Sequence, residues 1–219
     1  MKHDAQTWAD YAEALAFVGN SLLAPMSQTK TVGLEPEFWA GFPAFDDEDV
    51  AQALESCAAY AREAQAKVAG GGKPVQDASV EYTRLFVGPP HPEAAPWETM
   101  YRPGFEGATV GFGQATFEMR ALLRNAGLEI SNENNQYADH VGIELLYASV
   151  LCGTCAQAAE EGDKARQLQI ASELSSFVDG RMLAWVPKLK DAVESAAPAG
   201  YISRLLELGI ALLKCARIA

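Results

Sequence analysis

The residues best suited to chemistry lie close together in the second half of the chain, where Asp139, His140 and Glu144 interrupt an apolar run. His140 and Glu144 are four residues apart, so on a helix they share one face, with Asp139 beside them. A charge left unpaired in such a place is costly or shifts its pKa. We therefore expect each to meet a partner, either a local structural contact or a ligand. A small helical hydrolase or nucleotide-binding enzyme using His140 with Asp139 or Glu144 is one hypothesis.

Other candidate motifs favour structural roles. Cys152 and Cys155 have the spacing of a metal or redox site, but the chain has no second Cys pair or Cys/His pair, and a structural zinc needs four ligands. We interpret both as small buried core residues. The run GFG at 111–113 follows no strand and is interpreted as a helix start. A di-iron bundle requires histidines with a glutamate three residues before them, and no histidine of this chain has one. We therefore expect no metal, no cofactor and no catalytic residues.

A second unusual cluster is the stretch EYTRLFVGPPHPEAAPWETMY, residues 81–101, with four prolines, four aromatic residues and three glutamates. Proline removes a backbone donor, fixes φ and disfavours helix in the residue before it. Residues 88–96 therefore cannot be helix interior. The prolines stiffen this loop and lower the entropy lost when it is ordered on binding, while Trp97 and Tyr101 offer broad aromatic faces.

Apolar periodicity predicts helices through the rest of the chain. Asp46 or Asp47 is the expected cap of the second helix, and Gly70–Gly72 is expected to be a flexible joint. The segment containing His140 is apolar on nearly all sides, which is typical of a central helix. No alternating strand pattern is found, so we expect an all-α fold. The predicted helices are 4–24, 46–69, 76–87, 109–125, 135–161, 163–178, 180–195 with a kink at Pro187, and 198–217.

Length and composition exclude several classes of protein. The chain has 219 residues, of which 49% are apolar, which suits one domain with a buried core. We divide it into N-terminal helices (1–69), the joint (70–74) and a motif-bearing core (75–219). The net charge of −12 opposes binding to nucleic acid and favours basic partners.

Targeting signals and membrane spans are not expected. The first residues contain acids and no continuous apolar core, so they are no secretory signal and we expect a cytoplasmic protein. The run 141–159 is broken by Glu144 and does not suit a membrane span. Without an export signal, the four cysteines are expected to be reduced thiols.

The two clusters together resemble a known family. The patterns Y-x-x-L-F-x-G-P, P-W-E-T-M-Y and D-H-x-G-x-E-L are similar to motifs of the TorD/DmsD/NarJ family of redox-enzyme maturation chaperones. The stretch 177–209 also resembles the end of that family's chains, although Arg181 stands where histidine is frequent, and Thr99 where serine is usual. The matching residues are Tyr82, Leu85, Phe86, Gly88, Pro89, Pro96, Trp97, Glu98, Tyr101, Asp139, His140, Gly142, Glu144 and Leu145.

This resemblance implies an all-helical chaperone, not an enzyme. Its partner would be the twin-arginine leader and the apo form of a molybdenum- or tungsten-dependent oxidoreductase, held until the cofactor is loaded, as a monomer or a swapped dimer. Two arginines and an apolar stretch need carboxylates and an aromatic groove, which the two clusters supply. The residues expected to bind the leader are Leu85, Phe86, Gly88, Pro96, Trp97, Glu98, Tyr101, Asp139, His140 and Glu144.

The sharpest expectation is that the two clusters form one groove, although nearly forty residues separate them. Trp97 and Tyr101 should line it beside Asp139 and His140. Glu98 should either face the ligand or anchor the loop by accepting backbone N–H groups. A separation of more than about 15 Å between Trp97 and His140 would refute the shared groove.

Overall fold

The protein is an assembly of helices, as the periodicity predicts. The computed structural model describes residues 3–88, 90–104, 112–131 and 136–217. Within these ranges there is no strand, and the only β-type pairing is a single antiparallel bridge between Trp97 and His140. The all-α prediction is confirmed.

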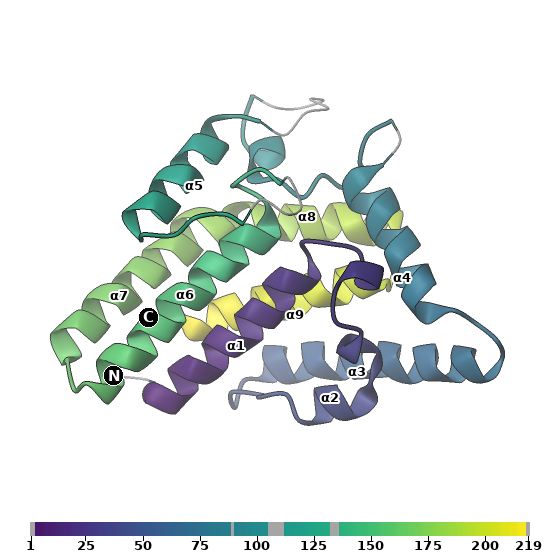
Figure 1. Ribbon diagram of the computed structural model, residues 1–219, viewed down its shortest axis with the longest axis horizontal. Helices are drawn as coiled ribbons and strands as arrows, with labels where there is room; N and C mark the ends of the chain where they lie inside the picture. Colours follow the sequence, from purple (N-terminus) through teal and green to yellow (C-terminus); the bar gives the residue numbers. More distant parts are fainter. Residues whose placement is uncertain (1–2, 89, 105–111, 132–135, 218–219) are drawn as a thin grey trace.

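The helices follow one another in the order labelled in Figure 1, and η denotes in the text a short 3₁₀ or π turn. The turns η3 and η6 are π-helical and continue α4 and α7 directly. The bounds are α1 Ala5–Ser21, η1 Met26–Gln28, η2 Val32–Leu34, α2 Pro36–Ala40, α3 Glu48–Ala69, α4 Pro74–Tyr82, η3 Thr83–Val87, η4 Glu98–Tyr101, α5 Gln114–Asn125, α6 Val141–Glu160, α7 Lys164–Phe177, η6 Val178–Met182, α8 Leu183–Ala196 and α9 Tyr201–Ala216.

Local sequence signals set several helix starts. The side chains of Asp4, Asp47 and Asp163 accept hydrogen bonds from the free N–H groups of α1, α3 and α7, at 2.8, 3.1 and 3.0 Å. Such caps stabilise a helix by about 1 kcal/mol. Pro36 and Pro74 occupy the first helical position, where their missing N–H costs nothing. Asp47 is thus the cap of α3, one of the two candidates expected.

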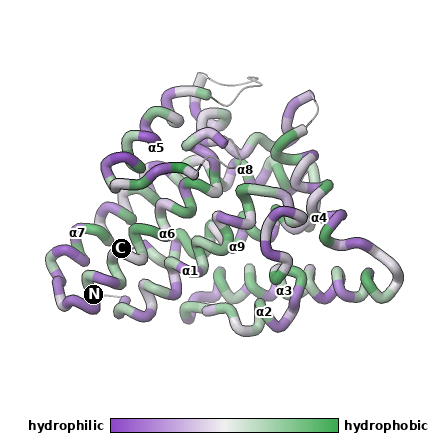
Figure 2. Tube along the Cα trace, in the orientation of Figure 1, coloured by the Kyte–Doolittle hydropathy of each residue, from purple (hydrophilic) through white to green (hydrophobic). Residues whose placement is uncertain are grey.

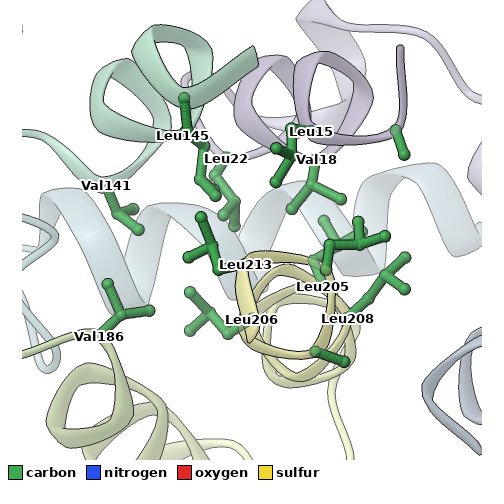
Figure 3. Close-up of a cluster of buried hydrophobic side chains, with 14 of the residues drawn as sticks. Leu15, Val18, Leu22, Val141, Leu145, Val186, Leu205, Leu206, Leu208 and Leu213 are labelled. Atoms are coloured by element: carbon green, nitrogen blue, oxygen red, sulfur yellow. The ribbon is translucent and has the colours of Figure 1, made fainter. Parts of the chain in front are cut away.

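The core forms where α1, α6 and α9 meet. In Figure 1 α7, α6 and α1 lie side by side, and α9 passes behind them to contact α3 and α8. Figure 3 shows the contact at close range: leucines and valines of α1, α6, α8 and α9 interdigitate, among them Leu15, Val18, Leu145 and Leu206. These four side chains are at most 1% exposed.

Two glycines bring α1 and α6 together. A Cβ atom on Gly142 would lie 2.6 Å from the carbonyl oxygen of Gly19, and one on Gly19 would lie 2.9 Å from that of Gly142. The two backbones can approach this closely only because glycine has no Cβ atom. The crossing fixes the start of α6, and with it the residues that precede it.

α6 is the central helix that its composition indicates. Among the described residues it is the one helix long and apolar enough to cross a membrane, but 72% of its most apolar window is buried inside the protein. In Figure 2 the central helices α6 and α9 are mostly green, whereas α3 alternates between green and purple. The apolar surface of α6 is therefore largely covered by the protein's own helices.

The structure corrects several predicted helix bounds. α6 begins at Val141 and not at residue 135, because the backbone of the preceding residues pairs with the loop after Pro96. α5 begins at Gln114, and residues 109–111 of its predicted start lie outside the described residues, as does residue 135. Gly180 does not begin a new helix, since η6 joins α7 to α8 without a break. Gly70–Gly72 form the turn between α3 and α4, and its flexibility stays a prediction, as does the division at 70–74.

Candidate functional site

The two sequence clusters meet at the start of α6, in what we call the junction (residues 96–102 and 137–144). The N–H of Val141 donates to the carbonyl of Pro96, and the N–H of Glu98 donates to that of Asp139, both at 2.9 Å. The rings of Trp97 and His140 are 6.3 Å apart between centroids. The prediction that the clusters meet in space is therefore confirmed, whereas the groove that they were expected to form stays a prediction.

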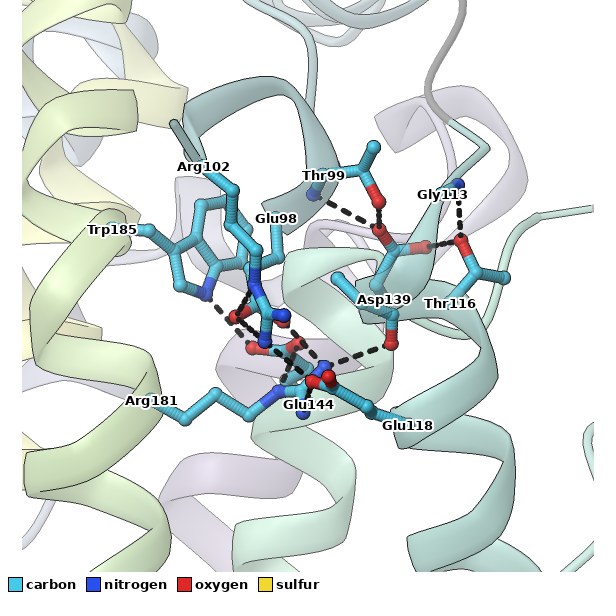
Figure 4. A network of polar contacts seen from close by, with 11 residues as sticks. Glu98, Thr99, Arg102, Gly113, Thr116, Glu118, Asp139, Glu144, Arg181 and Trp185 are labelled. Carbon is cyan, nitrogen blue, oxygen red and sulfur yellow. Dashed lines mark hydrogen bonds and ion pairs between the residues drawn. The ribbon is translucent and has the colours of Figure 1, made fainter. Parts of the chain in front are cut away.

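Asp139 ties three segments together. Its carboxylate accepts hydrogen bonds from the N–H of Thr99 (3.0 Å), the hydroxyl of Thr99 (2.6 Å) and the hydroxyl of Thr116 on α5 (2.8 Å), as Figure 4 shows. The residue is completely buried. Three donors satisfy most of its acceptor capacity, which makes a buried carboxylate tolerable. Asp139 thus anchors η4 and α5 to the start of α6.

His140 is the N-cap of α6. Its Nδ1 accepts a hydrogen bond from the N–H of Gly142 at 3.0 Å, so the proton of the neutral ring is assigned to Nε2. Complete burial lowers its pKa to about 3, and the ring is neutral at physiological pH. Phe86 and Trp97 contact it edge-on, at 6.2 and 6.3 Å between centroids. A base with this pKa is a poor general base at neutral pH, which disfavours the enzymatic hypothesis.

A buried ion network lies on the other side of the junction. Glu144 accepts from Nε of Arg181 at 3.1 Å and from the indole N–H of Trp185 at 3.0 Å. Arg181 also pairs with Glu98 and donates to the carbonyl of Ala115 at 2.9 Å. Because Arg181 lies in η6 and Trp185 one turn later in α8, both point at the same carboxylate (Figure 4).

Arg102 closes the network toward solvent. Its guanidinium donates to Glu98 at 2.9 and 2.8 Å and to Glu118 of α5 at 2.6 Å. The side chain of Arg102 is 32% exposed, whereas that of Arg181 is 10% exposed. The hydrogen bond from Arg102 lowers the pKa of Glu118, so this pair is fully ionised.

The buried position of Glu144 favours its neutral form. Burial, and then the neighbouring charge of Glu98, raise the pKa of Glu144 well above its ordinary value, against the opposing effect of Arg181. With Glu144 neutral, the carboxylates of Glu98 and Glu118 face the guanidinium groups of Arg102 and Arg181, two negative charges against two positive ones. A buried network is stable only with such balance, because an unpaired buried ion is strongly destabilising.

The remaining predicted site residues surround this centre. Leu85 and Phe86 are buried in η3, and Pro96 is buried as well. Tyr101 is half-buried and stacks on Trp185 at 5.6 Å between ring centroids. Gly88 has a φ of +66°, and a Cβ there would lie 2.0 Å from the carbonyl oxygen of His91, so the turn after η3 requires glycine.

The role foreseen for Glu98 needs correction. Its side chain neither lies open to a ligand nor accepts backbone N–H groups, since it is 4% exposed and engaged by Arg102 and Arg181. Glu98 does anchor the loop, but through ion pairs with the guanidinium groups of Arg102 and Arg181. Sequence reasoning missed both arginines and Glu118. The available signal was Arg181 itself, a charge one turn before a buried tryptophan in an apolar segment.

The structure also shows the state of the cysteines and bears on a possible metal site. Cys152 and Cys155 are both fully buried in α6, which confirms their interpretation as core residues, and none of the four cysteines forms a disulfide. Burial raises the pKa of Cys155 to about 12, so its thiol is unreactive. No group of three or more histidine, cysteine, aspartate or glutamate residues in the described ranges could hold a metal ion.

Comparison with families of known proteins gives a match. The family model described as nitrate reductase delta subunit matches residues 44–191. This span contains the junction, the ion network and every residue expected to bind a leader. No curated protein matches the chain.

Proposed function

The chain belongs to the nitrate reductase delta subunit family, whose members are chaperones of molybdoenzyme maturation, and from this we propose that it binds the twin-arginine leader of a molybdenum- or tungsten-dependent oxidoreductase. It would act in the cytoplasm on the apo form of the catalytic subunit and release it once the cofactor is loaded. The observation that carries the proposal is the junction, where both motif clusters come together.

The chemistry of the junction supports an arginine-bearing ligand. Glu98 and Glu118 already bind two guanidinium groups of the chain itself, so their spacing suits such groups. A guanidinium of the leader reaches these carboxylates by replacing one of the two. Arg102 is the replaceable one, because it is 32% exposed and comes from a short turn, whereas Arg181 is nearly buried.

Aromatic surface beside the carboxylates supports an apolar ligand segment. Trp97 and Tyr137 are half-buried and contact each other, at 5.8 Å between ring centroids, and Phe112 continues the row at 5.4 Å from Tyr137. The indole N–H of Trp97 and Nε2 of His140 have no hydrogen-bond partner among the described residues. Unsatisfied donors cost about 1–3 kcal/mol each, and a water molecule beside either atom would remove that cost.

Calorimetric titration with a synthetic leader peptide tests the proposal. A peptide with two consecutive arginines and an apolar stretch should bind with micromolar affinity or tighter, and more weakly as salt concentration rises. The matched control replaces both arginines by lysine. It should bind less well, since lysine lacks the planar fork that pairs with a carboxylate. If no leader of a molybdoenzyme from the same genome binds, the proposal is wrong.

A further inference from the structure

The carboxylates of Glu98 and Glu118 together bind a guanidinium group that belongs to the protein itself. Glu98 lies in η4 and Glu118 in α5. The guanidinium of Arg102 donates to Oε1 of Glu98 at 2.9 and 2.8 Å and to Oε2 of Glu118 at 2.6 Å (Figure 4). We call these two carboxylates the clamp. Charge-assisted bonds of this kind are also how proteins recognise the guanidinium group of a ligand.

Arg181 positions the clamp independently of Arg102. It pairs with Oε2 of Glu98, whereas Arg102 bonds to Oε1, and it pairs with Oε2 of Glu118 at 3.4 Å. Arg181 is itself held in place, because it donates to the carbonyl of Ala115 at 2.9 Å and its side chain is only 10% exposed. If Arg102 moved away, Arg181 would still hold the clamp, and two carboxylates would then face one guanidinium group.

Arg102 is attached to the fold more loosely than Arg181. It follows the four-residue turn η4 and precedes Pro103 and Gly104, and the φ of Gly104 is +90°. The side chain of Arg102 is 32% exposed, and its backbone N–H donates to the carbonyl of Thr99 at the long distance of 3.4 Å. Ion pairs that are open to solvent contribute little to stability. Rotation of this one side chain can therefore empty the clamp without unfolding a helix.

We propose that Arg102 is an internal competitor, which occupies a guanidinium-binding site, the clamp, and closes it to arginines from outside until a ligand displaces it. Exchange of one guanidinium group for another leaves the number of ion pairs unchanged. The apparent affinity of a ligand is reduced by the fraction of molecules in which the clamp is closed. An isolated arginine side chain therefore binds weakly, and only a ligand that makes further contacts displaces Arg102. The identity of the natural ligand rests on the proposed function, whereas the guanidinium site itself does not.

Arg102→Ala empties the clamp and allows a test with a small probe. N-acetylarginine amide carries one guanidinium group and should bind this variant with roughly millimolar affinity. It should bind the wild type roughly tenfold more weakly, because the tethered Arg102 competes at a high effective concentration. N-acetyllysine amide has the same charge without the planar fork, so it should bind the variant less well. Thermal melts at rising probe concentration measure binding, since a ligand of the folded state raises the melting temperature.

Three further variants establish where the probe binds. Arg62→Ala removes an arginine from an exposed surface pair with Glu55, and it should respond to the probe as the wild type does. Arg102→Ala combined with Glu118→Gln lacks one carboxylate of the clamp and should lose the gain in probe binding. Arg102→Gln keeps a hydrogen-bond donor at the rim and replaces the alanine variant if that variant does not fold. Equal responses of the wild type and the Arg102 variants would overturn the proposal.

A leader peptide separates this inference from the proposed function. A peptide with two arginines and an apolar stretch should bind Arg102→Ala roughly tenfold more tightly than the wild type, because no side chain has to be displaced. Probe binding to Arg102→Ala without any leader binding would support the guanidinium site and end the leader proposal. A leader that binds the wild type but binds Arg102→Ala no more tightly would overturn the internal competitor and leave the leader proposal standing.

Discussion

At the scale of single residues, the junction is a set of carboxylates already held by arginines. Glu98 is the central member, since it joins Arg102 at the rim to Arg181 inside. Asp139 likewise holds the loop, by accepting hydrogen bonds from a hydroxyl and an N–H group. Under the proposed function, a leader would have to compete with bonds that hold the loop in place, which would couple ligand binding to the order of the loop.

The first residue-scale prediction concerns Glu98→Gln. The amide keeps the shape but loses the charge that faces two arginines, so the free energy of unfolding should fall by about 2 kcal/mol. The loss stays below that of a fully broken buried pair, because Glu144 can then ionise more easily beside Arg181. Urea unfolding measures the change.

The control for this variant is Glu93→Gln. Glu93 is exposed and pairs with Arg84 at 3.4 Å at the surface, where such pairs contribute little. Its unfolding midpoint should stay close to that of the wild type. Equal stability of the two variants would show that Glu98 does not hold the loop.

At the scale of elements, periodicity was informative within helices and weak at their ends. The apolar run around Leu145 predicts a central helix, and α6 is one. The run cannot reveal that Asp139 and His140 precede the helix, because the backbone bonds that set its start join Asp139 to Glu98 and Val141 to Pro96, some forty residues earlier. Helical periodicity also cannot reveal the role of Arg181, because its three carboxylate partners come from three other elements.

The element-scale prediction uses two glycines of the same helix. Gly142→Ala places a Cβ 2.6 Å from the Gly19 carbonyl oxygen, which forces α1 and α6 apart and should lower stability by about 1–3 kcal/mol. Gly153→Ala meets only Ala12 at 3.8 Å. It should be neutral or stabilise by up to about 1 kcal/mol, because alanine favours helix over glycine. Denaturant midpoints of both variants measure the difference, and a shift of the same sign in both would contradict the close crossing.

At the scale of the whole molecule, the all-α architecture follows from the sequence, whereas the electrostatic state of the core does not. It depends on how completely the fold removes His140 and Glu144 from water, and both are fully buried. Burial favours the neutral form of each, the free base of His140 and the protonated acid of Glu144. His140 resists gaining a proton and Glu144 resists losing one. Each should therefore affect how stability depends on pH.

The sign for each group follows from proton linkage. The pKa of His140 is lowered from 6.5 to about 3, so its contribution to stability is complete above 6.5 and is lost as pH falls toward 3. The pKa of Glu144 is raised above 4.5, so its contribution is complete below 4.5 and is lost as pH rises toward its folded pKa. Between pH 4.5 and 6.5 the two effects oppose each other. The pH dependence of wild-type stability therefore shows neither of them clearly.

Two substitutions separate these effects. His140→Asn keeps a good helix cap but removes the base, so stability should fall relative to the wild type as pH rises from 4.5 to 6.5. Glu144→Gln removes the acid, so stability should instead rise relative to the wild type over the same window. The slope for His140→Asn approaches 1.4 kcal/mol per pH unit, about one proton, and the slope for Glu144→Gln has the opposite sign. Both are measured as urea midpoints across the window. His91→Asn, at an exposed histidine, should run parallel to the wild type, and parallel curves for all three variants would show that the core holds neither a neutral histidine nor a protonated glutamate.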